Sequence, residues 1–179
     1  MPPRFGRRAF LTSGAAAALA AGAPKGAGAE EPATDAYREP ARDVPIVEHD
    51  DVIVCGGGPA GVAAALAAAR AGAKTRLLEV NGCLGGVWTA GLLSWILDAA
   101  NKTGMMREML AELARRQASA KYGSSIGYDI EQMKRMLEAM CLEAGVNLRL
   151  HSRVVAAVRD PTNRLRLAVT VRSPTRRSR

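Results

Sequence analysis

The sequence predicts an α/β fold built around a central parallel sheet, with a helical insertion and a terminal β-hairpin. Three observations support this prediction: a glycine-rich turn between an apolar run and an alanine-rich run, an acid at the end of the next apolar run, and three short apolar runs near the C-terminus. The turn is a GxGxxG motif formed by Gly56, Gly58 and Gly61. Between a strand and a helix, this motif is typical of a Rossmann-like unit that holds the diphosphate of a dinucleotide.

The glycine motif is expected to follow a strand at 51–55 and to open a helix near position 59. The first glycine permits a sharp turn, the second lets the backbone approach a diphosphate, and the third lets helix and strand pack closely. The start of the helix favours an anion because its N–H groups are unpaired and its dipole is positive there. The residues expected to line the cofactor are therefore Gly56, Gly58, Pro59, Ala60 and Gly61.

A second strand is expected at 73–78, and it ends in Glu79. Glu79 lies eighteen residues after Gly61, close to the spacing of about twenty at which a carboxylate reaches the ribose hydroxyls of a dinucleotide. A carboxylate there suits the adenosine half of FAD and of NAD equally well, and it argues against the 2′-phosphorylated form of NAD.

Further elements follow the βαβ unit. Helices are expected at 103–121 and at 129–144, where Asp129 and Gln132 form a capping-box pattern. Strands are expected at 146–150, 154–158 and 165–171, the last two joined by the turn 160–163. The apolar stripes that face the core comprise Met106, Met109, Leu110 and Leu113 in the first helix, and Ile130, Met133, Met136, Leu137, Met140 and Cys141 in the second.

Residues 51–86 resemble the opening of flavoproteins with the glutathione-reductase type of FAD-binding fold. The stretch 51–171, which includes Trp88-Thr89-Ala90-Gly91, is similar to a bacterial group of FAD-dependent oxidoreductases. The resemblance implies FAD as the cofactor, Gly85 and Gly86 toward its flavin end, and Val154 near its adenine. It also implies hydride or electron transfer between an organic substrate and an acceptor, neither of which the sequence identifies.

The resemblance further implies that the chain is truncated. Similar flavoproteins continue with a segment that returns to the flavin and with a large substrate domain, whereas here a hairpin is followed by the tail 172–179. We expect an incomplete FAD-binding domain at 49–171 and a basic, disordered tail. An NAD-dependent dehydrogenase domain and a non-catalytic remnant are the alternatives, and no residue is named as a catalytic acid or base.

The N-terminus predicts export. Arg7-Arg8-Ala9-Phe10-Leu11 precedes an alanine- and glycine-rich stretch that ends at position 29, which is typical of a twin-arginine signal peptide. The apolar part is too short and too weakly apolar for a stable membrane anchor. We therefore expect a signal at 1–29, the twin-arginine machinery as a partner, a periplasmic or secreted location, and an irregular leader at 30–48.

Charge and cysteine content restrict the remaining possibilities. Of 25 Lys and Arg residues, four lie in 1–29 and four in 172–179, which leaves 17 against 17 acids, so no basic face for nucleic acid is expected. Cys55 and Cys141 are expected to be buried as small hydrophobes, and Cys83 to lie near the flavin. The two histidines, His49 and His151, lie far apart in the chain, and no metal site is expected.

Overall fold

The computed structural model describes residues 40–172. The predicted signal (1–29), the first part of the leader (30–39) and nearly all of the tail (173–179) lie outside the described residues. All the helices and strands of the described part belong to one compact unit, which begins at Ile46.

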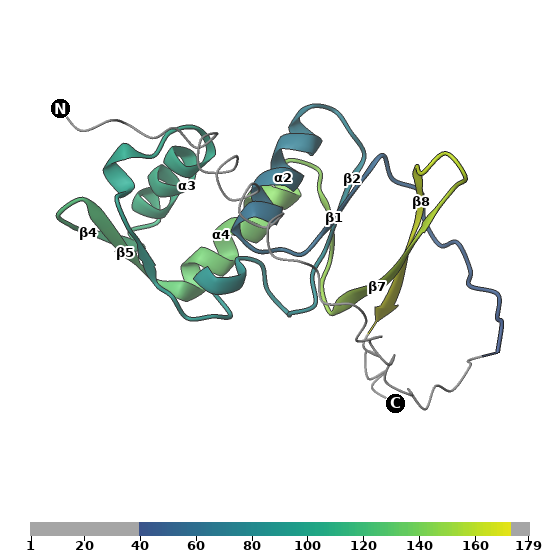
Figure 1. Ribbon diagram of the computed structural model, residues 1–179. Coiled ribbons are helices and arrows are strands. Elements are labelled where there is room, and N and C mark those ends of the chain that lie inside the picture. The colour runs from purple at the N-terminus through teal and green to yellow at the C-terminus, as the bar shows by residue number, and fades with distance from the viewer. Residues whose placement is uncertain (1–39, 173–179) are drawn as a thin grey trace, which may run out of the picture. The chain divides into compact units, whose positions relative to one another are not determined.

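A parallel sheet of three strands forms the centre of this unit. It contains β1 (Val52–Cys55), β2 (Thr75–Leu78) and β6 (Asn147–Arg149), in the order β1-β2-β6. The helix α2 (Pro59–Arg70) connects β1 to β2, while a much longer connection joins β2 to β6 (Figure 1). Since the predicted strand 146–150 joins the sheet as β6, the prediction of a Rossmann-like parallel sheet is confirmed.

The core lies between this sheet and the helices α2 and α4 (Ile130–Glu143). Leu66 of α2, Leu77 of β2 and Leu137 of α4 are fully buried and belong to one apolar cluster. The start of α4 is capped as predicted, because the Asp129 carboxylate accepts from the Gln132 N–H (2.8 Å). The reciprocal half of the capping box does not form, because the Asp129 N–H donates to the Ala118 carbonyl instead (2.8 Å).

The connection from β2 to β6 contains a helix and a small antiparallel sheet. The helix α3 (Gly104–Arg115) is followed by β4 (Ser119–Tyr122) and β5 (Ser125–Tyr128), and β5 also pairs with β3 (Trp95–Ile96). The prediction that the helix continues to 121 is wrong. It ends at Arg115 because Gln117 adopts a left-handed conformation (φ 55°) and the Ala118 N–H bonds back to the Leu113 carbonyl (2.9 Å).

A long hairpin, β7 (Ser152–Arg159) and β8 (Leu165–Arg172), confirms the predicted terminal hairpin. A cavity of about 390 Å³ lies between it and β1, lined on the β1 side by Ile53 and Cys55. Cys55 is exposed, so the prediction that it is buried is wrong. Among the described strands β1 pairs only with β2, and Cys55 lies on the face away from the helices, where no core covers it.

The same face of β2 carries a buried cation. Arg76 is 5% exposed, and its Nε lies 2.7 Å from Oδ2 of Asp50, whose side chain is also buried. Arg76 is also paired with Glu48. Burial lowers the pKa of Arg76, and the positive charge of Arg149 lowers it further. These ion pairs attach the segment before β1 to the centre of the sheet.

Candidate dinucleotide-binding site

The glycine loop follows directly after β1 and has the backbone that the motif requires. Gly56 adopts φ +109°, a conformation that favours glycine, and its N–H donates to the Leu78 carbonyl of β2 (2.8 Å). Gly61 allows the first turn of α2 to rest on the loop, because a Cβ there would lie 1.8 Å from the Gly56 carbonyl oxygen. The first and third glycines are therefore needed for the turn and for its packing.

The start of α2 offers free backbone donors. Pro59 begins the helix, Gly58 is its N-cap without any side-chain cap, and no acid lies in the first turn. Within residues 40–172 the N–H groups of Gly58, Ala60 and Gly61 have no hydrogen-bond partner. A Cβ built on Gly58 meets nothing within 4 Å, so there is open space beside the N-cap of this helix. An accessible helix N-terminus of this kind suits a phosphate group.

Glu79 reaches this loop from the end of β2. Its carboxylate is buried and accepts three hydrogen bonds: Oε2 from the Gly57 N–H (2.5 Å), and Oε1 from the N–H (2.7 Å) and Nδ2 (2.8 Å) of Asn81. A carboxylate offers about four acceptor positions, so Oε2 retains one. A ribose hydroxyl can donate there, while a second hydroxyl requires the Asn81 side chain to move away from Oε1.

The pair Gly85–Gly86 packs against the glycine loop that follows β1. The Gly85 N–H donates to the Gly57 carbonyl (2.7 Å), and Gly85 and Gly86 both adopt positive φ, 106° and 54°. A Cβ on Gly86 would lie 3.0 Å from the Gly58 Cα. The turn that begins at Gly86, the 3-10 helix Gly86–Trp88, therefore lies beside the start of α2.

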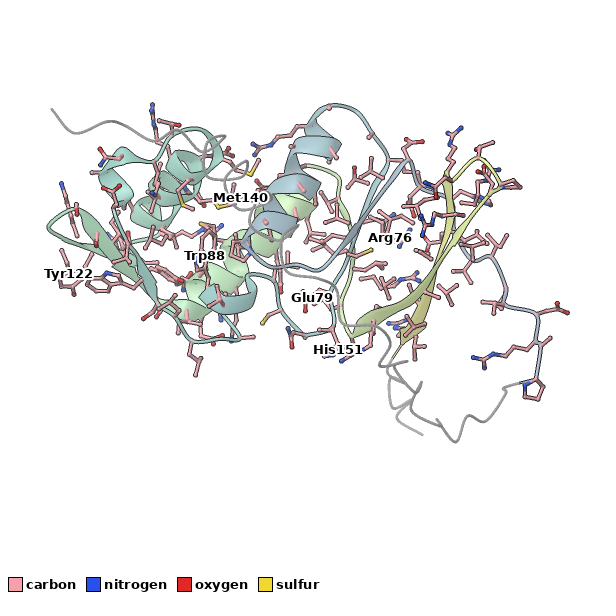
Figure 2. The ribbon with its side chains drawn as sticks, viewed as in Figure 1. Arg76, Glu79, Trp88, Tyr122, Met140 and His151 are labelled. Atoms are coloured by element: carbon pink, nitrogen blue, oxygen red, sulfur yellow. The ribbon has the colours of Figure 1, made fainter. Side chains whose placement is uncertain are left out.

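The structure thus brings all but one of the predicted site residues into one cluster, which comprises the loop and the start of α2, Glu79 at the end of β2 (labelled in Figure 2), and Gly85 and Gly86 at the start of the following turn. Val154 is not brought to it. Val154 is half-buried in β7, pairs with Thr170 and lines the cavity that faces Ile53 and Cys55. Its contact with an adenine stays a prediction.

Sequence reasoning missed three residues that shape this cluster. Asn81 holds Glu79, the Thr89 hydroxyl donates to the Leu84 carbonyl before Gly85, and the Tyr128 hydroxyl donates to the Leu93 carbonyl after it. The position of Asn81, two residues after the acid, is a local signal that could have been used. Tyr128 lies more than 30 residues from its partners, so no local pattern points to it.

The other reactive side chains form no second centre in the described part. Cys83 is half-buried, with its Sγ 3.9 Å from Oγ1 of Thr89, and Cys141 is buried, which raises its pKa to about 11. Across residues 40–172 no three His, Cys, Asp or Glu side chains are grouped to hold a metal. Over the same range, no helix is both long and apolar enough to cross a membrane.

Comparison with known proteins agrees with this geometry. Residues 51–178 match the model of the family described as FAD dependent oxidoreductase. Among solved structures, the chain is similar to THI4 of Thermovibrio ammonificans (20% identity, TM-score 0.51, 68% of this chain and 47% of that one). It is also similar to a geranylgeranyl bacteriochlorophyll reductase-like protein of Thermoplasma acidophilum (21% identity, TM-score 0.51, 68% and 34%).

These structural likenesses concern the fold, and the chain spans less than half the length of either protein. No curated protein matches the chain.

Proposed function

Because the chain belongs to the FAD dependent oxidoreductase family, we propose that it is the FAD-binding portion of an oxidoreductase that transfers hydride or electrons between an organic substrate and an acceptor. FAD is the cofactor of that family, and the bound flavin would supply the redox chemistry. The contribution of this chain is to bind and orient the cofactor. No acid or base in the cluster is assigned a catalytic role.

One observation carries the proposal: unpaired N–H groups lie at the start of α2, beside open space at Gly58, and the Glu79 carboxylate lies at the same loop, 2.5 Å from the Gly57 nitrogen. The N–H groups of Gly58, Ala60 and Gly61 would hold the diphosphate without a lysine. Glu79 would accept from the ribose next to it. The turn that begins at Gly86 would meet the part of the cofactor that continues beyond the diphosphate.

The test is a titration of the full chain with FAD, monitored by the visible absorption and fluorescence of the flavin. The informative variant is Gly58→Val. Gly58 has an ordinary φ of −67° and a Cβ there meets nothing, so the variant is expected to fold while its side chain fills the open space beside the start of α2. Ala64→Val, at an exposed position of the same helix, is the matched control.

We expect the unmodified chain and Ala64→Val to bind FAD, and Gly58→Val to bind at least about tenfold more weakly, which corresponds to about 1.4 kcal/mol. Stabilisation by NAD without flavin binding would favour a dehydrogenase domain, the alternative enzyme. A folded chain indifferent to both would favour a non-catalytic remnant and refute the proposal.

Export is a separate part of the proposal. The pair Arg7-Arg8 before a short apolar stretch supports a twin-arginine signal and a periplasmic or secreted location. Fractionation of cells that produce the full chain tests this. Replacement of both arginines by lysine is expected to keep the chain in the cytoplasm, and an unchanged distribution would refute the export route.

A further inference from the structure

Two buried hydroxyl groups form hydrogen bonds to the segment 84–93, which contains the turn after Gly85. Thr89 is fully buried, and its Oγ1 donates to the Leu84 carbonyl (2.5 Å). Tyr128, which is 8% exposed, reaches the same turn from β5, and its hydroxyl lies 2.6 Å from the Leu93 carbonyl oxygen and 3.0 Å from that of Trp88. The segment 84–93 is therefore held at both ends by hydroxyls.

The packing around these hydroxyls leaves the turn little freedom. A Cβ on Gly85 would lie 2.6 Å from Cγ2 of Thr89, so the turn rests directly on the Thr89 side chain. The Tyr128 hydroxyl has one proton and two carbonyl neighbours, so it donates to one of them at a time and links both ends of 88–93 to β5. Burial raises the pKa of Tyr128 to about 12, so the proton stays on the hydroxyl at neutral pH.

The turn lies where a dinucleotide would continue past its diphosphate. Glu79 bonds to the Gly57 N–H just before α2, and the turn packs on the start of α2 through Gly86, where a Cβ would lie 3.0 Å from the Gly58 Cα. A ligand with its ribose at Glu79 and its diphosphate at the start of α2 would therefore extend toward the turn. Within the described residues the N–H groups of Gly86 and Val87 have no hydrogen-bond partner, so both are available to the part of the ligand beyond its diphosphate.

We propose that Tyr128 and Thr89 are positioning residues that hold the 84–93 turn in the conformation needed to receive the flavin half of FAD. This inference rests on the proposed function. The hydroxyls act through the turn and do not themselves contact the cofactor. Their effect is to order the turn before FAD binds. The loss of conformational entropy on ordering the turn then does not weaken the binding.

A purely structural role predicts a different result from a positioning role. General loss of folding would weaken every ligand of the domain, whereas a loosened turn would weaken only ligands that extend beyond the diphosphate. ADP contains the adenosine and the diphosphate and lacks the flavin half. The ratio of the FAD and ADP dissociation constants therefore isolates the contribution of the turn.

The experiment compares the full chain with its Tyr128→Phe and Thr89→Val variants, and measures both dissociation constants and the thermal unfolding midpoint. Tyr122→Phe is the matched control, because it removes the hydroxyl of a tyrosine that is 56% exposed. We expect each of the first two variants to bind FAD about five- to tenfold more weakly, the range set by the loss of one hydrogen bond. We expect ADP binding to change less than twofold, and the control to match the unmodified chain.

Equal loss of FAD and ADP affinity, or unchanged FAD affinity in both variants, would overturn the inference while leaving the proposed function intact. If Tyr128→Phe does not fold, Thr89→Val decides the outcome by the same criteria. Absence of FAD binding by the unmodified chain would overturn the proposed function, and this inference with it.

Discussion

Replacement of Glu79 by glutamine tests the centre of the site. The glutamate accepts three hydrogen bonds, one at Oε2 from Gly57 and two at Oε1 from Asn81. A carboxamide has one oxygen and one NH₂ group, so one of its ends must face a donor. The Asn81 side chain can turn its own oxygen toward the NH₂ group, but the backbone N–H groups of Gly57 and Asn81 remain donors. At least one of them loses its partner, in a contact that is buried at Gly57 and part-buried at Asn81.

One buried unpaired group costs about 1–3 kcal/mol. We therefore expect Glu79→Gln to lower the free energy of unfolding by about that amount, measured by urea denaturation without ligand. The variant also loses a charged acceptor for the ribose, worth about 1.5–3 kcal/mol, so FAD affinity is expected to fall about 10- to 150-fold. Glu143→Gln, at an exposed position whose side chain makes no hydrogen bond in the described part, is the control. Wild-type stability together with wild-type FAD affinity would refute the reasoning.

Two further predictions concern buried groups. Arg76→Met leaves the Asp50 carboxylate buried without its nearest cation, so we expect a loss of about 3–5 kcal/mol in urea unfolding, partly restored by Asp50→Asn in the double variant. A single variant as stable as the unmodified chain would contradict this. In maleimide labelling followed by mass spectrometry, exposed Cys55 is expected to react first. Burial raises the pKa of Cys141 from 9.0 to about 11, so its labelling should stay slow at neutral pH and increase only as the pH rises toward 11. Equal rates at pH 7 would contradict the structure.

The βαβ unit was predictable because its signals are local. The apolar run 52–55, the glycines, Pro59 at the start of α2 and the acid after β2 lie within about thirty residues, and each has one physical reason. The cap of α4 by Asp129 is equally local. Where such short-range requirements determine the structure, the predicted and observed elements agree to within a few residues.

The antiparallel sheet β3-β5-β4 was not predicted, because its strands are short and carry a weak pattern. Residues 119–122 and 125–128 contain serine, alanine, lysine and glycine beside single aromatic or aliphatic side chains. Gly123, at φ +61°, marks the turn between them and was the available signal. The exposure of Cys55 was missed for another reason, since it depends on β1 having one neighbour strand in the described part, which the strand sequence does not encode.

The residue that joins the site together is Gly57, one of the unspecified positions of the motif. Its N–H donates to Glu79 and its carbonyl accepts from Gly85, so one residue links the loop, the end of β2 and the second glycine pair. A Cβ on Gly57 would lie 2.7 Å from Cδ2 of Leu84 and 3.1 Å from Oε2 of Glu79. A side chain at 57 would therefore move the acid and the turn together. The spacing of the motif glycines concerns the turn and the proposed contact with a ligand, whereas the hydrogen bonds of Gly57 hold the acid and the turn after Gly85 in position.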